Sequence, residues 1–70
     1  MRVSLQAARI NAGYTQKSAA EKLGISKESL RFYEQYKQSP KIDLAFKIAK
    51  LYKCEIGDII FLKDDIALSD

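Results

Sequence analysis

Five side chains at the start of a predicted helix combine hydrogen-bonding and apolar groups: Lys27, Glu28, Ser29, Arg31 and Phe32. Lysine and arginine donate to guanine O6 and N7, glutamate accepts from cytosine N4, and phenylalanine packs on thymine methyl groups. Ser29 can pair with a base or a phosphate, and Arg31 can hold a phosphate instead of a base. Two structural alternatives remain open. The helix dipole also favours Glu28, and Phe32 shares a stripe with residues 25, 29 and 36 that would place it in the core.

The sequence offers no set of residues for catalysis or for holding a metal or cofactor. It contains no histidine, which excludes a cysteine–histidine zinc site, and its single cysteine, Cys54, cannot form an internal disulfide. No phosphate-cradling glycine loop is present either. We therefore predict that the protein is not an enzyme, that it binds no metal and no cofactor, and that Cys54 is a buried structural thiol.

Charge is distributed unevenly along the chain. The net charge of +3 combines +7 over residues 1–53 with −4 over residues 54–70. A basic body indicates a polyanionic partner, although lysine is also a common solvated surface residue. Charge alone therefore favours nucleic-acid binding without establishing it.

The length and the hydropathy pattern limit the class of protein. Seventy residues form one domain with a small core. No run of about 18 apolar residues exists, so we expect no membrane span. The N-terminus, MRVSLQAAR, lacks the apolar stretch of a signal peptide. With its lone cysteine, the chain is expected to work in the reducing cytoplasm.

Start and stop signals predict an all-α protein. The five predicted helices span about residues 3–12, 16–23, 27–35, 42–52 and 56–61. Thr15 and Ser26 are the N-caps of the second and third helices, and Gly13 and Gly24 end the first and second. The fourth has the clearest 3.6-residue period. In the last, β-branched residues leave a strand as an alternative.

The spacing of Ala20, Gly24 and Leu30 predicts a steep corner between the second and third helices. A small residue lets the two backbones approach, a glycine takes the left-handed conformation, and a leucine fixes the third helix. Tyr33 lies on the same inward face as Leu30. The corner is either a helix-turn-helix unit, whose second helix enters the DNA major groove, or an ordinary helical hairpin that serves only the core.

Taken together, several motifs resemble the Cro and phage-repressor helix-turn-helix domains, also called XRE-type, over roughly residues 5–60. The matching features are Leu5 and Arg9, GYTQKSAAEKLGIS, YE at 33–34, SP at 39–40, LAFKIAKLY from 44 and IGDII from 56. The resemblance implies a compact five-helix bundle of the phage-repressor type, with helices 2 and 3 as the DNA reader. It also implies an ion pair between Arg9 and Glu34.

The resemblance also assigns DNA contacts. It implies a phosphate-contacting glutamine at Gln16, at the start of helix 2, where Thr15 and Lys17 would add backbone contacts. It implies base reading by positions 27, 28, 29, 31 and 32. Further phosphate contacts are assigned to the loop residues Lys37, Gln38 and Ser39.

Two positions depart from the family pattern. Phe32 stands where the family often has asparagine or glutamine, and it either contacts the groove or is partly buried. Tyr36 stands where the family commonly has glycine, and tyrosine takes a left-handed conformation less readily. We therefore expect helix 3 to end differently or to run slightly longer, which puts the loop contacts in question. The Tyr36 hydroxyl could donate to a phosphate or serve in packing.

One such unit reads few base pairs, so we predict a homodimer on a (pseudo)palindromic operator in double-stranded DNA. Phe61 and Leu62 are the candidate dimer-interface residues, with Ile66 and Leu68 as further possibilities. Residues 1–62 form the helix-turn-helix domain and residues 63–70 an acidic tail.

The predicted function is a sequence-specific transcriptional regulator, most simply a repressor that covers a promoter. An alternative is an antitoxin or antirepressor, which would use the same fold to bind a protein. No small-molecule ligand is expected.

Overall fold

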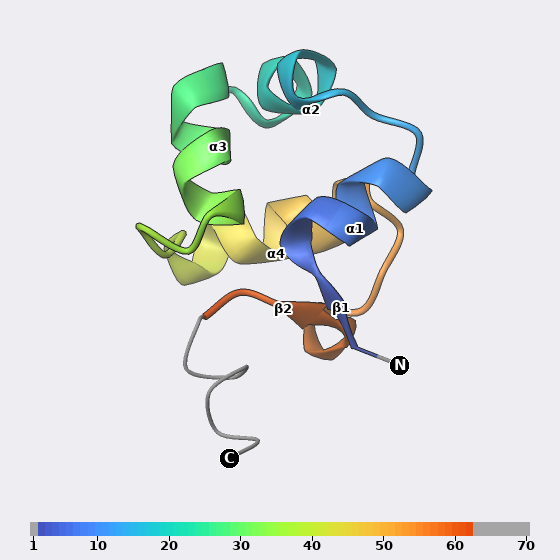
Figure 1. Ribbon diagram of the computed structural model, residues 1–70. Helices are drawn as coiled ribbons and strands as arrows, with labels where there is room; N and C mark the ends of the chain where they lie inside the picture. Colours follow the sequence, from blue (N-terminus) through green and yellow to red (C-terminus); the bar gives the residue numbers. More distant parts are fainter. Residues whose placement is uncertain (1, 63–70) are drawn as a thin grey trace.

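A computed structural model describes residues 2–62 of the chain (Figure 1). Its elements, in chain order, are β1 (Val3–Ser4), α1 (Leu5–Asn11), α2 (Gln16–Leu23), α3 (Lys27–Glu34), α4 (Ile42–Leu51), the 3₁₀ helix η1 (Ile56–Asp58) and β2 (Ile59–Ile60). The predictions for the acidic tail, including Ile66 and Leu68, lie outside the described residues. The architecture is therefore mostly helical, as predicted, with a small sheet in addition.

Local capping sets the ends of α2 and α3. The Thr15 hydroxyl accepts from the amide of Ser18, whose own hydroxyl accepts from the Thr15 amide, so the two residues form a capping box. Ser26 caps α3 by accepting from the amide of Ser29. Gly24 ends α2 in the left-handed conformation, with φ of +73°. The predicted caps and the predicted stop are confirmed.

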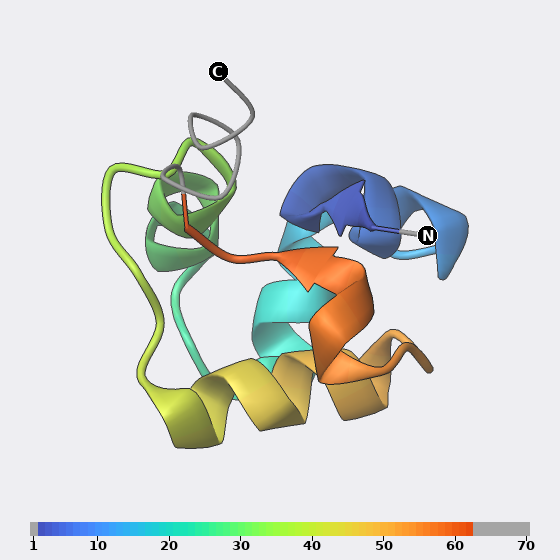
Figure 2. The same cartoon turned by 90° about the horizontal axis from the view of Figure 1, so that it is seen from below.

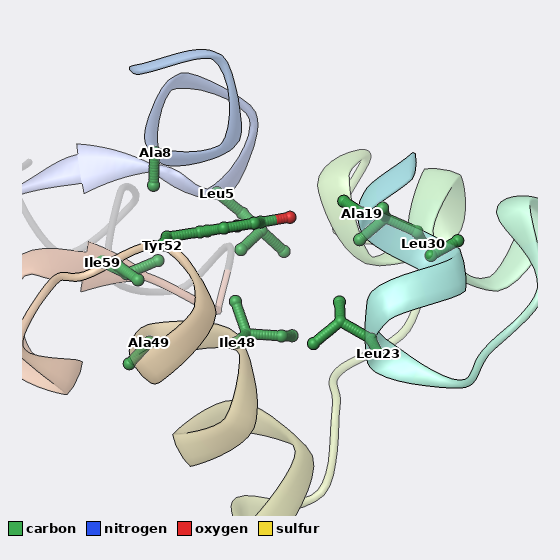
Figure 3. Close-up of a cluster of buried hydrophobic side chains, with 10 residues drawn as sticks. Leu5, Ala8, Ala19, Leu23, Leu30, Ile48, Ala49, Tyr52 and Ile59 are labelled. Carbon is green, nitrogen blue, oxygen red and sulfur yellow. The ribbon is translucent and has the colours of Figure 1, made fainter. Parts of the chain in front are cut away.

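The core lies where α1, α2, α3 and α4 meet, closed by β2 (Figure 3). The largest fully buried side chains are those of Leu5, Leu30, Ile48 and Ile59. Ala20 is buried at the corner, as predicted, and Tyr33 packs half-buried against the core. Lys47 of α4 donates to the carbonyl of Leu23 at 3.2 Å and so satisfies an otherwise open end of α2.

The prediction of a fifth helix over residues 56–61 holds only for a 3₁₀ helix over residues 56–58, and the strand alternative is confirmed for residues 59–60. The segment makes one 3₁₀ turn and then becomes β2, in which Ile59 pairs with Val3 and Ile60 with Ser4 in parallel register. The β-branched isoleucines favour this extended backbone. The first helix is correspondingly shorter than predicted, because Val3 and Ser4 belong to β1. The sheet closes the end of the molecule opposite α2, as Figures 1 and 2 show.

The prediction that Tyr36 would alter or lengthen the end of α3 is wrong. Tyr36 adopts the left-handed conformation, with φ of +60°, directly after the C-cap residue Gln35. Its hydroxyl donates to the carbonyl of Ile60 at 2.9 Å and accepts from the amide of Leu5 at 3.3 Å. These hydrogen bonds compensate a backbone conformation that costs a residue with a Cβ about 1–2 kcal/mol. The hydroxyl is thus engaged within the fold.

Candidate nucleic-acid interface

The outward face of α3 carries the five side chains that sequence reasoning singled out. Leu30 is fully buried, so the residues around it on the helix turn toward solvent. Lys27, Glu28 and Arg31 are exposed, whereas Ser29 and Phe32 are half-buried. The structure therefore presents hydrogen-bond donors and acceptors along one helix. Ser29 is partly occupied already, because its hydroxyl accepts from that of Ser26 at 2.9 Å.

Glu28 and Arg31 pair with each other on this face. The Arg31 Nη2 lies 3.5 Å from the Glu28 Oε2, at the i, i+3 spacing of neighbouring helical side chains. Both side chains remain largely exposed, so the pair contributes little to stability. It does orient a donor and an acceptor side by side at the surface.

Phe32 lies beneath two positive charges. The guanidinium carbon of Arg31 is 5.1 Å from the ring centroid, and the ammonium nitrogen of Lys37 is 5.9 Å from it. Both distances fall within the range of cation–π interaction. The sequence left groove contact and partial burial open for Phe32. In the protein without DNA, Phe32 is partly buried.

Arg9 and Glu34 form the ion pair that the resemblance implied. The Arg9 Nε lies 2.7 Å from the Glu34 Oε2, and the Nη2 donates to Oε1 at 3.4 Å. A third guanidinium nitrogen, Nη1, donates to the carbonyl of Tyr14 at 2.8 Å. Both charged residues are buried, so each needs these partners to offset the loss of water. The pair fixes α3 against α1.

Gln16 extends this buried network to the start of α2. Its side-chain amide donates to the Glu34 Oε1 at 3.0 Å, and the residue is half-buried. Thr15 and Lys17, on either side of it, are exposed at the N-terminus of α2. Sequence reasoning did not anticipate the Gln16–Glu34 hydrogen bond, since no local pattern relates positions that are 18 residues apart.

The loop after α3 presents Lys37, Gln38 and Ser39 at the surface, and all three are exposed. Ser39 also lines a shallow hollow of about 290 Å³ beside Tyr33, Lys41, Asp43 and Leu44. The Tyr36 hydroxyl, a candidate phosphate donor by sequence, points away into its bonds with Leu5 and Ile60. Phosphate contact by that hydroxyl is therefore not compatible with the described fold.

Three further features of residues 2–62 bear on the sequence predictions. Within this range no three histidine, cysteine, aspartate or glutamate side chains gather closely enough to hold a metal ion. Over the same residues no helix has the length and apolar character needed to cross a bilayer. Cys54 is half-buried rather than buried as predicted, and its thiol donates to the carbonyl of Tyr52 at 3.4 Å.

Comparison with known proteins shows which family the corner between α2 and α3 and the surrounding helices belong to. A family model described as helix-turn-helix matches residues 5–59. The chain belongs to this helix-turn-helix family, of the XRE type. The match runs from the first residue of α1 to the first residue of β2, so it covers the corner, the Arg9–Glu34 pair and the loop after α3.

Several relatives of this helix-turn-helix protein are named transcriptional regulators. An uncharacterized HTH-type transcriptional regulator of Archaeoglobus fulgidus is 34% identical over 65 residues, which is 93% of each chain. One from Methanocaldococcus jannaschii is 43% identical over 51 residues, 73% of this chain and 77% of that one. The regulator ImmR of Bacillus subtilis is 41% identical over 63 residues, 90% of this chain but 49% of ImmR. No solved structure matches the chain.

Proposed function

We propose that this protein is a transcriptional regulator that binds specific sequences in double-stranded DNA in the cytoplasm and represses by covering a promoter. One observation carries the proposal: α3 is capped, fixed from behind by the buried Arg9–Glu34 pair, and turned so that Lys27, Glu28 and Arg31 face outward. Membership of the helix-turn-helix family and the names of the relatives support it.

In this reading, α3 enters the major groove and α2 rests its N-terminus on the DNA backbone. Lys27 donates to guanine, and Glu28 accepts from cytosine N4 when its partner Arg31 turns to the DNA. Thr15, Gln16 and Lys17 contact phosphates at the start of α2. Gln16 also links the phosphate contact at the start of α2 to the position of α3, because its side-chain amide donates to Glu34 of α3.

The protein acts as a homodimer on a (pseudo)palindromic operator. A single α3 of eight residues spans too few base pairs for a unique site. Two copies related by a two-fold axis would read half-sites about 34 Å apart, which is one turn of the double helix.

The experiment begins with selection of bound duplexes from random DNA by the full chain, followed by titration at several salt concentrations. We expect a symmetric motif and binding whose logarithm falls steeply with the logarithm of salt. The variant Lys27→Gln/Arg31→Gln should lose at least about tenfold in affinity, because it removes two donors to the DNA and a base contact by Lys27 alone contributes about 1–3 kcal/mol. Lys50→Gln/Lys53→Gln removes the same charge at exposed positions around the end of α4 and should retain most binding.

Two results would overturn the proposal. One is that a folded Lys27→Gln/Arg31→Gln variant binds the selected duplex as tightly as the wild type. The other is a stable one-to-one complex with a protein partner together with no salt-dependent binding to duplex DNA, which would favour the antitoxin or antirepressor alternative.

A further inference from the structure

The surface after α3 brings two cations to one aromatic ring from two different elements. Arg31 comes from α3 itself, whereas Lys37 comes from the loop beyond it. Their charged groups lie 5.1 Å and 5.9 Å from the centroid of Phe32. We call Arg31, Phe32 and Lys37 the aromatic clamp.

The backbone of the turn builds this clamp. The left-handed Tyr36 reverses the chain after α3, so that the amide of Lys37 donates to the carbonyl of Phe32 at 3.0 Å. The Tyr36 hydroxyl fixes the turn by its bonds to Leu5 and Ile60. The fold therefore brings the backbone of Lys37 back to α3, within reach of the Phe32 ring for its side chain.

Charge in the clamp is only partly balanced. Glu28, at 3.5 Å from Arg31, faces that cation, and no acidic side chain of the described residues pairs with Lys37. Two cations held by one ring repel each other, and an anion bound in their vicinity would be attracted by both. A DNA-backbone phosphate has this charge, and its oxygens accept hydrogen bonds from an arginine guanidinium and from a lysine ammonium.

We propose that Phe32 is a positioning residue that holds Arg31 and Lys37 for a grip on the DNA backbone, and that it does not read a thymine methyl group. The inference rests on the proposed function and assigns one part of its surface. It changes the role of position 32 from sequence reading to backbone binding. Phosphate contacts lower affinity for all sequences alike when they are lost, whereas base contacts alter discrimination at one position.

The test compares Phe32→Leu and Phe32→Tyr with the wild type on the selected duplex and on a scrambled duplex of the same composition. Phe32→Leu removes the ring and keeps an apolar side chain. It should weaken binding to both duplexes by a similar factor of about five to thirty, as expected from two exposed cation–π interactions. The slope of log affinity against log salt should become shallower by about 1. Phe32→Tyr keeps an aromatic face and should retain both affinity and slope.

Double variants show whether the effect passes through the two cations. Phe32→Leu combined with Lys37→Gln should cost less than the two single changes together, because both disturb one clamp. Phe32→Leu combined with Lys17→Gln, at an exposed residue of α2, should be additive. Should Phe32→Leu fail to fold, Arg31→Gln and Lys37→Gln leave the ring in place. Each should then lower the salt slope by about 1 and weaken both duplexes alike.

Three results would overturn the clamp while leaving the proposed function intact. The first is a folded Phe32→Leu variant whose slope of log affinity against log salt is unchanged and which no longer prefers thymine at one position of the site. The second is additivity of Phe32→Leu with Lys37→Gln. The third is that Arg31→Gln or Lys37→Gln lowers the affinity for the selected duplex only and leaves the affinity for the scrambled duplex unchanged. Absence of salt-dependent binding by the wild type would instead contradict the proposed function itself.

Discussion

Tyr52 buries a hydroxyl group that has no hydrogen-bond partner among residues 2–62. The residue is 3% exposed, and its oxygen, at the tip of the Tyr52 ring in the core cluster, is fully enclosed (Figure 3). Burial first, and then the negative charge of Glu34, raises the pKa of Tyr52 from 10.0 to about 12, with Arg9 opposing. An unsatisfied buried hydroxyl costs about 1–3 kcal/mol, so this tyrosine stabilises through its ring, which lies 6.1 Å from that of Tyr14 between centroids.

Stability should therefore fall in alkali in a way that depends on Tyr52. In the unfolded chain its phenol ionises near pH 10, whereas in the folded protein it keeps its proton to about pH 12. The free energy of unfolding contributed by this group is present below pH 10 and is lost as the pH rises from there toward 12. Urea unfolding at about pH 8 and about pH 11 measures the loss.

Tyr52→Phe provides the control for that loss. The variant keeps the ring and removes the unpaired hydroxyl, so its free energy of unfolding near neutral pH should rise by about 1 kcal/mol. Between about pH 8 and about pH 11, the free energy of unfolding of this variant should fall less than that of the wild type. An equal decline in both proteins would mean that the other tyrosines cause the alkaline loss.

The corner between α2 and α3 depends on a glycine conformation more than on space. A Cβ at Gly24 would meet nothing within 4 Å, but φ is +73°. Gly24→Ala should therefore lower the free energy of unfolding by about 1–2 kcal/mol without altering contacts. Gly57→Ala is a matched control, because the same Cβ test finds open space and φ is not left-handed there. It should leave stability unchanged or slightly raised, as measured by urea unfolding, and equal losses in the two variants would contradict this account.

Local signals explain why the corner could be predicted from sequence. Thr15, Ser26 and Gly24 act within a few residues of where they stand, so cap and stop chemistry placed α2 and α3 correctly. The inward face of Leu30 followed from helical spacing. The candidate DNA-contacting residues on α3 could be predicted next, because they are the residues of that helix that its packing does not require.

Long-range contacts explain what the sequence could not predict. The strands β1 and β2 have two residues each, and they form only by pairing with each other. Such short strands have no periodic pattern from which they could be predicted. The left-handed Tyr36 opposes the local preference of tyrosine and is compensated by hydrogen bonds to residues 31 and 24 positions away. The clamp depends on that turn, and so its geometry was equally hidden.

At the scale of the whole molecule, exposed apolar side chains mark the surfaces that the proposed dimer would use. Leu62 is 45% exposed, whereas Phe61 is half-buried against the core. Ile42 and Phe46 form a separate exposed pair one turn apart on α4, at 67% and 55%. The predicted dimer surface at Phe61 and Leu62 and this α4 pair are thus distinct and can be tested against each other.

We expect Phe61→Ala/Leu62→Ala to weaken self-association measured by sedimentation. Leu62→Ala alone should do so with little loss of stability, because that side chain is exposed, while Phe61→Ala should also lower the free energy of unfolding. The matched variant Ile42→Ser/Phe46→Ser should leave the mass in solution unchanged. The assignment of the interface would be wrong if only the α4 variant dissociated the protein.

The shared hydroxyl of Tyr36 joins parts of the chain that lie far apart in the sequence. It accepts from the amide of Leu5 and donates to the carbonyl of Ile60, so both ends of the described domain meet at the turn after α3. Contacts of such long sequence separation carry a loop-closure entropy that the local caps of α2 and α3 do not. The turn is therefore complete only once the two ends of the domain have come together.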